Sequence, residues 1–393
     1  MRARVLMVFV CMGCEGTDEP VREDAGVRAP MREAGTSEQP DEEPGAERAL
    51  DAGTRPDASV VDARVEPVQD ARMAEQVDAH VEDPRDWKPH ASWTCGMPEG
   101  IPEPGAAPLA FTARFSTRAA HEVGRTPVGQ RHLRELGEGS VEGDALEATL
   151  LAGGFESSVT LANGAVELEQ VVMLRARDGK YLYLRVCGTA PSEREPVRVV
   201  MDFEAPNNSD HAALQKAKLV GTRELDASGN VTLEVHDVAS VKLGPTLQIE
   251  NPPDAVDQTW ACKEATRSAG EEQFRENVAI GSSLSVGQSK NGNRNVIPIT
   301  GGRVTGRVTA DVLAHGADFQ LLGSRIVLDA RYTLKGDGGA LVLVRNCGPG
   351  SALIPVFEAS VDGPYAFLNE DVWVSSTPGL GIGSVNIVIS RQR

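Results

Sequence analysis

The chain carries the same sequence unit twice, and this repeat restricts its fold more than any other feature. Each unit begins with a Trp-x-Cys triplet and later reaches a Cys-Gly pair that ends an apolar run. At one constant offset of 163 residues the units share Gly124 and Gly287, Gly129 and Gly292, Arg131 and Arg294, Gly139 and Gly302, Gly143 and Gly306, and Gly153 and Gly316. Units of roughly 130 to 150 residues have the usual size of a domain. The repeat therefore predicts two domains, at residues 91–245 and 258–393.

The correspondence continues after a few residues are gained or lost in one loop. The later matches join Leu168-Glu169 to Leu328-Asp329, Arg185 to Arg345, Cys187 to Cys347, and Phe203-Glu204-Ala205 to Phe357-Glu358-Ala359. Both copies are therefore complete.

Local patterns in each unit are typical of antiparallel strands. Asn163-Gly164 separates two apolar runs and suits a two-residue hairpin turn, because glycine and asparagine tolerate positive φ. Glycines inside strand-like runs, such as Gly143 and Gly306, favour bends at which a sheet curls on itself. We expect an all-β protein with two tandem antiparallel β-barrels, and short helical turns near residues 210–218 and 364–369.

Four cysteines occupy matching places in the two units. The similar separations favour one disulfide per unit, Cys95 with Cys187 and Cys262 with Cys347, and each would contribute on the order of 4 kcal/mol in the loop-entropy account. Four buried free thiols are the alternative. No metal site is predicted, since the sequence has no Cys-x-x-Cys pair or nearby histidine cluster.

The N-terminus resembles a bacterial lipoprotein signal. Residues 1–13 combine a basic start with a short apolar stretch, and a cysteine follows at Cys14. Lipidation of Cys14 would anchor the chain to a membrane, and Glu15 favours the outer membrane, facing either the periplasm or the exterior. Plain secretion and a cytoplasmic chain with an apolar start are the alternatives.

Residues 14–90 are predicted to be a disordered acidic linker. From residue 15 to residue 86 there is no Phe, Trp or Tyr, so too little apolar surface is available to offset the entropy of ordering. Residues 15–92 hold 21 acidic and 9 basic side chains, a net charge of −12 out of −18 for the whole chain. Such a charge argues against nucleic acid or an anionic membrane surface as a partner.

The second unit resembles a known family. The residues that carry the likeness are Gly292-Asn293-Arg294, the run 297–302, His315-Gly316-Ala317-Asp318-Phe319, the run 328–332, the run 338–344, Phe357-Glu358, the run 365–369 and Val372-Trp373-Val374. Together they are similar to domain of unknown function 3237, and the first unit matches more thinly through Val123-Gly124, Thr126-Pro127 and Arg131. The resemblance implies a calycin-like antiparallel barrel and brings no established reaction.

A polar patch in the second unit is the candidate site. If a hairpin turns near Gly323-Ser324, Asp318 falls roughly opposite Asp329 with Arg331 diagonal to it. The first unit has Phe155 and Val171 as counterparts of Asp318 and Arg331, so we predict that the second barrel keeps a polar interior that the first has filled. Asp318, Asp329, Arg331 and Tyr332 are the candidate ligand-binding residues. An ion pair that only fixes the strand register is the alternative.

No sequence motif assigns a reaction or a cofactor. There is no nucleophile elbow, zinc-protease helix, phosphate loop or calcium loop. The favoured function is binding of a small apolar or amphiphilic ligand inside a barrel. The alternatives are an enzyme of isomerase, cyclase or lyase type that uses the Asp318 patch, and a structural or interaction module without a ligand site.

Overall fold

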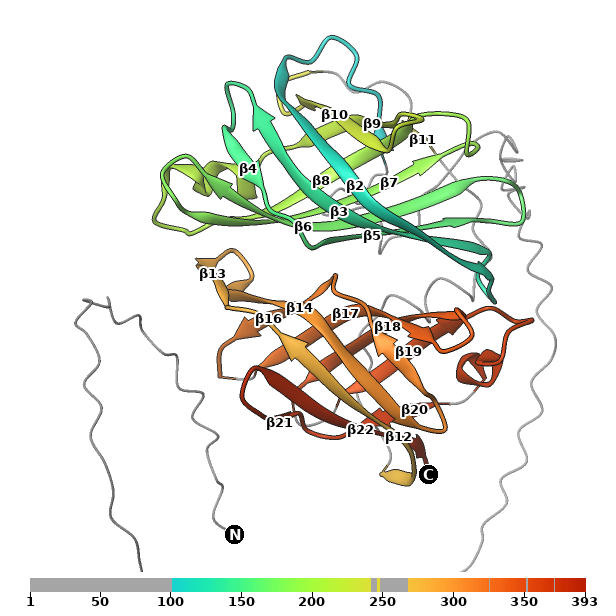
Figure 1. Ribbon diagram of the computed structural model, residues 1–393. Helices are drawn as coiled ribbons and strands as arrows, with labels where there is room; N and C mark the ends of the chain where they lie inside the picture. The colour runs from blue at the N-terminus through green and yellow to red at the C-terminus, as the bar shows by residue number, and fades with distance from the viewer. Residues whose placement is uncertain (1–100, 242–245, 248–267, 325, 351–352, 371) are drawn as a thin grey trace, which may run out of the picture. The chain divides into compact units, whose positions relative to one another are not determined.

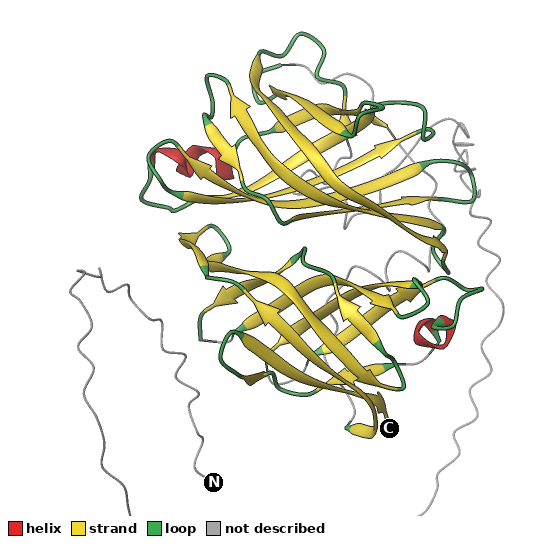
Figure 2. Cartoon of the chain, viewed as in Figure 1, coloured by secondary structure: helices red, strands yellow, loops and turns green. Residues whose placement is uncertain are grey.

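The computed structural model describes residues 101–241, 246–247, 268–324, 326–350, 353–370 and 372–393. This part of the chain is almost entirely β-structure, arranged as two large antiparallel sheets (Figure 1, Figure 2). The predicted fold class is confirmed. The predicted signal at 1–13, the lipidation site Cys14, the linker at 14–90, and Cys95 and Cys262 lie outside the described residues.

The first sheet closes on itself. Its strands are β2 (Leu109–Arg125), β3 (Gln130–Glu142), β4 (Ala148–Leu150), β5 (Gly154–Thr160), β6 (Val166–Ala176), β7 (Tyr181–Ala190), β8 (Val197–Glu204), β9 (Leu219–Leu225) and β10 (Asn230–Asp237). The ladder runs β2-β10-β9-β8-β7-β6, and the pairs β6 with β5, β5 with β3, and β3 with β2 complete the ring. Two short strands flank this sheet in the sequence, β1 (Ile101–Pro102) before it and β11 (Thr246–Leu247) after it. They pair with each other in a separate two-stranded ladder.

The second sheet repeats this order. Its strands are β12 (Ala269–Ile280), β13 (Leu284–Ser289), β14 (Gly292–Gly306), β15 (Ala310–Val312), β16 (Ala317–Leu322), β17 (Val327–Gly336), β18 (Leu341–Pro349), β19 (Ile354–Ala359), β20 (Trp373–Ser375), β21 (Gly379–Leu380) and β22 (Ser384–Gln392). In the described residues, a bridge between Leu353 and Ser375 joins the β19 side to β20. This barrel is therefore less continuously hydrogen-bonded at that seam than the first one.

Turn chemistry explains several connections. Gly164 has φ +87° in the tight turn between β5 and β6, as the Asn163-Gly164 pair predicts. A Cβ at Gly143 would lie 2.4 Å from the Phe111 Cα, so only glycine lets the two backbones approach this closely. The predicted helical turns are confirmed as short 3₁₀ segments, η2 (Asp210–Gln215) and η3 (Ala366–Asn369).

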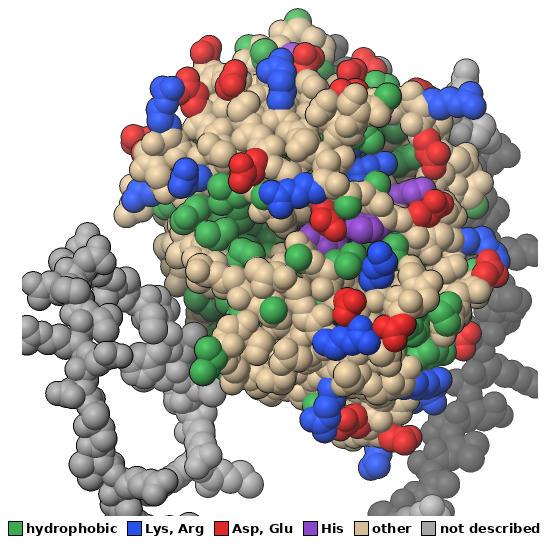
Figure 3. All heavy atoms as spheres, in the orientation of Figure 1, with side chains coloured by type: hydrophobic (Ala, Val, Ile, Leu, Met, Phe, Trp, Pro, Cys, Tyr) green, Lys and Arg blue, Asp and Glu red, His purple; other side chains and the backbone are tan. Residues whose placement is uncertain are grey.

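The two barrel interiors are packed differently. In the second barrel, Phe357 meets Phe274 and Trp373 edge to face, Phe274 and Trp373 are tilted to each other, and the three ring centroids lie 5.7 to 6.1 Å apart in the core. The first barrel has a core of Val, Leu and Ala with Phe111 and Phe203. The first barrel also holds the cavity described below. On the face drawn in Figure 3, basic and acidic side chains are interspersed over the described part of the chain.

Candidate ligand site in the first barrel

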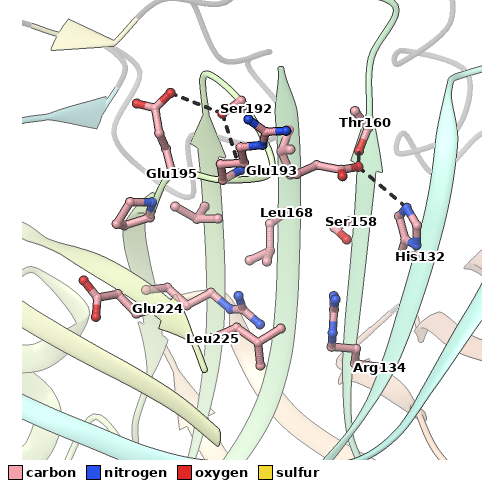
Figure 4. Close-up of a pocket in the computed structure, with 15 residues that line it drawn as sticks. His132, Arg134, Ser158, Thr160, Leu168, Ser192, Glu193, Glu195, Glu224 and Leu225 are labelled. Carbon is pink, nitrogen blue, oxygen red and sulfur yellow. Dashed lines mark hydrogen bonds and ion pairs between the residues drawn. The ribbon is translucent and has the colours of Figure 1, made fainter. Parts of the chain in front are cut away.

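A cavity of about 440 Å³ lies at one end of the first barrel. Its lining residues are His132, Arg134, Ser158, Thr160, Val166, Leu168, Ser192, Glu193, Arg194, Glu195, Pro196, Val197, Arg223, Glu224 and Leu225 (Figure 4). They come from β3, β5, β6, β8 and β9, and from the loop that joins β7 to β8.

Strand geometry places most of these side chains inside the barrel. Strands β3, β5, β6 and β9 each contribute residues two apart in sequence, which share one face of a strand. The ladder sets His132 opposite Ser158, and Ser158 opposite Leu168, so the contributions of neighbouring strands also share that face. Val197 lies opposite Arg223 in the same way. The inner face of the closed sheet therefore forms the wall of the cavity.

A buried carboxylate anchors the polar wall of this cavity. Glu156 is fully buried on the same face of β5 as Ser158. Its Oε1 accepts hydrogen bonds from Arg134 Nη1 at 3.1 Å and Arg223 Nη2 at 2.9 Å, and Arg223 Nη2 also lies 2.7 Å from Oε2. Gln170 Nε2 donates to Oε2 at 2.5 Å. The carboxylate thus holds two guanidinium groups at the base of the cavity.

Around Glu156 the basic groups outnumber the acidic one, although the lining as a whole also holds Glu193, Glu195 and Glu224. Two guanidinium groups face one carboxylate, and Arg223 is only 5 % exposed. Among the described residues, Arg223 Nε has no hydrogen-bond partner. A buried guanidinium is stabilised by an anionic partner, and an oxyanion in the cavity would add a charge-assisted interaction with Arg134 and Arg223.

The apolar lining and the rim differ in character from this polar wall. Val166, Leu168, Val197 and Leu225 supply an apolar surface. At the rim, Thr160 Oγ1 donates to Glu193 Oε1 at 2.5 Å, and His132 Nε2 lies 3.9 Å from that oxygen. The cavity therefore offers an apolar wall beside a cationic base, which suits an amphiphilic molecule.

The patch predicted in the second barrel is not one patch. In the ladder, Asp318 lies opposite Ala330 and Ala317 lies opposite Arg331, so Asp318 faces the side of the sheet away from Asp329 and Arg331. The predicted position of Asp318 opposite Asp329 is wrong by one residue. Asp318 Oδ1 accepts the backbone N–H of Asp329, at 3.2 Å.

A second one-residue error affects the comparison of the two copies. Val141 pairs with Ala148 in the first barrel, and its counterpart Val304 pairs with Ala310, so the loop between these strands is one residue shorter in the second copy. Glu156, not Phe155, is therefore the counterpart of Asp318. Both barrels keep an inward carboxylate, and the prediction that the first barrel has filled its polar interior is wrong.

Asp329 and Arg331 belong to a cluster that joins the two barrels. Asp329 accepts from Arg345 Nε at 2.9 Å and from Arg331 Nη2 at 2.9 Å, while Arg331 Nη1 lies 2.7 Å from Glu169 Oε2 of the first barrel. Burial alone would raise the pKa of Glu169, but the charges of Arg185, Arg331 and Arg345 lower it to about 2. The pKa of Asp329 is likewise held below its usual value by Arg331 and Arg345 against the effect of burial. Such mutually neutralised groups fix the packing of two surfaces.

Asp318 and Tyr332 face the interior of the second barrel. Tyr332 Oη donates to Glu276 Oε2 at 2.5 Å, and Gln320 Nε2 donates to Asp318 Oδ2 at 2.6 Å. Burial raises the pKa of Asp318 to about 6 and the pKa of Glu276 to about 7. The ligand-binding role of Asp318, Asp329, Arg331 and Tyr332 stays a prediction.

Sequence reasoning did not single out the residues of the first-barrel cavity. One signal was present: polar residues stand at every second position of 132–134 and 156–160, which places them on one strand face. The residue that completes the site, Arg223, comes from a strand far along the chain, and only the closed ladder brings it to Glu156.

The described residues contain no helix long and apolar enough to cross a membrane. They also contain no group of three or more His, Cys, Asp or Glu side chains arranged to hold a metal ion. Cys187 and Cys347 are both buried, at matching positions of β7 and β18, and their predicted pairing with Cys95 and Cys262 stays a prediction.

The sequence matches one family profile in two segments. The family described as "Protein of unknown function (DUF3237)" covers residues 106–238 and 270–351, one segment in each barrel. A UPF0311 protein of Bradyrhizobium diazoefficiens is 43 % identical over 77 residues, which is 19 % of this chain and 51 % of that protein. A UPF0311 protein of Rhodopseudomonas palustris is 41 % identical over 78 residues, 19 % of this chain and 51 % of that protein. The chain thus spans about half the length of the curated relatives it matches.

Solved structures similar to this chain each correspond to about a third of it. A conserved protein of unknown function from Rhodopseudomonas palustris is 27 % identical, with 32 % of this chain and 99 % of that chain covered and a TM-score of 0.28. A β-barrel-like protein from Acinetobacter baumannii is 20 % identical, with 34 % and 98 % covered and a TM-score of 0.29. An enzyme from Penicillium herquei is 18 % identical, with 35 % and 96 % covered and a TM-score of 0.27.

Proposed function

The chain belongs to the DUF3237 family, and from that premise we propose that its first barrel binds one small amphiphilic molecule that carries an acidic group. The observation that supports this most is that two guanidinium groups, Arg134 and Arg223, line the cavity and share the single carboxylate of Glu156. A carboxylate, sulfonate or phenolate is the chemistry that such a group recognises.

The size of the cavity supports a small ligand. A volume of about 440 Å³ lies within the roughly 300–1,000 Å³ of ordinary small-molecule sites. Leu168 and Val197 would contact the apolar body, while Arg223 and Arg134 would contact the acidic group. Glu156 keeps both guanidinium groups in place, so that little side-chain entropy is lost on binding.

The proposal is tested with a fluorescent amphiphilic anion. We expect 1-anilinonaphthalene-8-sulfonate to bind the folded chain at one site, measured by fluorescence titration. Replacing Arg223 by glutamine should weaken binding by about tenfold or more, because a charge-assisted hydrogen bond is lost. N-phenyl-1-naphthylamine, which lacks the sulfonate, should bind wild type more weakly than the anion does.

A matched control is Arg177→Gln. Arg177 pairs with Glu147 on the surface and its side chain is 85 % exposed, so its loss should leave binding of the anion unchanged. Equal binding of the sulfonate by wild type and Arg223→Gln, with circular dichroism showing both folded, would contradict the proposal.

The proposed setting is the cell envelope. Its support is the lipoprotein-like N-terminus, with Cys14 as the anchored residue and the acidic segment 14–90 as a tether. Mass spectrometry of the N-terminal peptide from membranes tests this: a diacylglycerol-modified Cys14 is expected, and a chain that retains Met1 would contradict it.

A further inference from the structure

The contact between the two barrels repeats itself about a two-fold relation. Arg131 of the first barrel donates from Nε and Nη2 to the two carboxylate oxygens of Glu358 in the second, each at 2.8 Å. Arg294 of the second barrel donates from Nε at 3.0 Å and from Nη2 at 2.5 Å to Oε1 of Glu204 in the first. Arg131 corresponds to Arg294 in the sequence repeat, and Glu204 corresponds to Glu358.

A hydroxyl joins each ion pair in the same way. Thr126 Oγ1 donates to Glu358 at 2.6 Å and lies 2.9 Å from the carbonyl of Gly129. Its counterpart, Ser289, donates to Glu204 at 2.5 Å and lies 2.9 Å from the carbonyl of Gly292. We name each set of arginine, carboxylate and hydroxyl a lock: lock one is Arg131, Glu358 and Thr126, and lock two is Arg294, Glu204 and Ser289.

Backbone bonds beside the locks also exchange. The N–H of Val361 donates to the carbonyl of Arg125 at 2.8 Å, and the N–H of Asn207 donates to the carbonyl of Gln288 at 2.7 Å. These pairs are again counterparts in the two copies. In lock one, the β2–β3 hairpin of the first barrel reaches the end of β19 in the second. In lock two, the β13–β14 hairpin of the second barrel reaches the end of β8, the strand of the first barrel that corresponds to β19.

Apolar contacts beside the locks obey the same exchange. Val123, Leu133 and Phe155 of the first barrel pack with Leu341 and Leu343 of the second. Their counterparts Val286, Val296 and Ala317 pack with Tyr183, which corresponds to Leu343. Residue i contacts j and the counterpart of j contacts the counterpart of i, which defines an isologous interface.

We infer that the two barrels form an internal dimer, in which each barrel binds the other as a second copy of itself, and that the two locks hold it without help from the joining segment. All six lock side chains are at most 8 % exposed. Burial alone would raise the pKa of Glu204, but the hydrogen bonds and charge of Arg294 lower it. One pair departs from the symmetry: Arg331 contacts Glu169, while Val171 stands in the corresponding place of the first barrel.

The test cuts the full chain between its barrels. A protease site replaces residues 251–257 in the segment that joins Leu247 to Ser268, and a denaturing gel without reductant confirms two separate pieces after cutting. The pieces should still migrate together at the mass of the intact chain in size-exclusion chromatography with light scattering at about 1 µM. Separation of the wild-type pieces at this concentration would overturn the inference.

Variants identify the locks as the cause. The double change Glu204→Gln and Glu358→Gln should let the cut pieces dissociate with a Kd about 100-fold higher or more, since each leaves a buried arginine without its charge partner. Glu147→Gln, which alters an exposed pair, should leave the Kd unchanged. Association of the double variant as tight as wild type would refute the role of the locks. If the double variant does not fold, the result for the cut wild-type chain decides the inference.

Discussion

Replacing Glu156 with glutamine should lower the stability of the first barrel and raise its affinity for anions. The two effects have one cause, because the carboxylate neutralises guanidinium groups that also line the cavity. Glu156 accepts from Arg223 at 2.7 and 2.9 Å and from Arg134 at 3.1 Å, and it is fully buried.

The loss of stability follows from the burial of Arg223. Breaking a buried ion pair by removing one partner costs about 3–5 kcal/mol, since the other charge stays buried and uncompensated. Arg134 is 23 % exposed, so water screens part of its charge and the lower end of this range applies to the site. Gln170 donates to the Glu156 carboxylate, and in the variant its N–H group would face the side-chain amide of the new glutamine, which has donors of its own. A change of about 3 kcal/mol lowers the unfolding temperature by about 10 °C in a domain of this size.

The gain in affinity follows from the uncompensated charge. Without Glu156, both guanidinium groups are available to a bound oxyanion. A charge-assisted hydrogen bond of about 1.5–3 kcal/mol corresponds to about a tenfold to hundredfold change in Kd. The Kd for 1-anilinonaphthalene-8-sulfonate should therefore fall by at least about tenfold in Glu156→Gln.

Two assays measure these effects on one preparation. Circular dichroism gives the unfolding temperature, and fluorescence titration at 20 °C below that temperature gives the Kd. Glu147→Gln, which removes a carboxylate from an exposed pair, should change neither quantity. Weaker anion binding by a folded Glu156→Gln variant would refute the reasoning, and so would an unchanged unfolding temperature.

Three further predictions concern the second barrel and the cysteines. Burial raises the pKa of Glu276 from 4.5 to about 7, so the folded chain binds a proton more tightly than the unfolded chain and loses stability as pH rises through this window. Glu276→Gln should therefore raise the unfolding temperature at pH 8 relative to wild type and change it little at pH 5. Thermal scans at both pH values will show this. Gly316 has φ +81°, and a Cβ there would lie 2.0 Å from the Arg331 carbonyl oxygen, so Gly316→Ala should prevent folding of the second barrel. Gly164 has φ +87° with open space around it, so Gly164→Ala should lower the free energy of unfolding by only about 1 kcal/mol in denaturant titrations. Peptide mapping without reductant should join Cys95 to Cys187 and Cys262 to Cys347, and a peptide that joins the two units would contradict the predicted pairing.

The architecture could be predicted because the repeat is visible when the two halves of the sequence are compared, and because the turns depend on residues that are neighbours in the sequence. Asn163-Gly164 and the glycines at bends act through backbone conformation, which sequence neighbours determine. The run 341–344 is apolar at every position, which is typical of a strand covered on both faces, and Leu341 and Leu343 do pack against the first barrel.

The site could not be predicted for two physical reasons. A strand alternates its faces with period two, so a one-residue error in the hairpin register put Asp318 on the wrong face, and the shorter loop before Ala310 gave it the wrong counterpart in the first copy. The cavity itself depends on closure: Arg223 meets Glu156 only because β9 and β5 line one closed ring, 67 residues apart in sequence. The interface role of Arg331 depends in the same way on tertiary structure, because its partner Glu169 belongs to the other barrel.

Native mass spectrometry of the chain purified from its own cells tests the proposed function most directly. We predict that the wild-type chain carries one small acidic molecule, and that Ser158→Trp, which places an indole in the first-barrel cavity, arrives without it while remaining folded. A bound molecule retained equally by wild type and Ser158→Trp would show that the ligand lies elsewhere and would contradict the account.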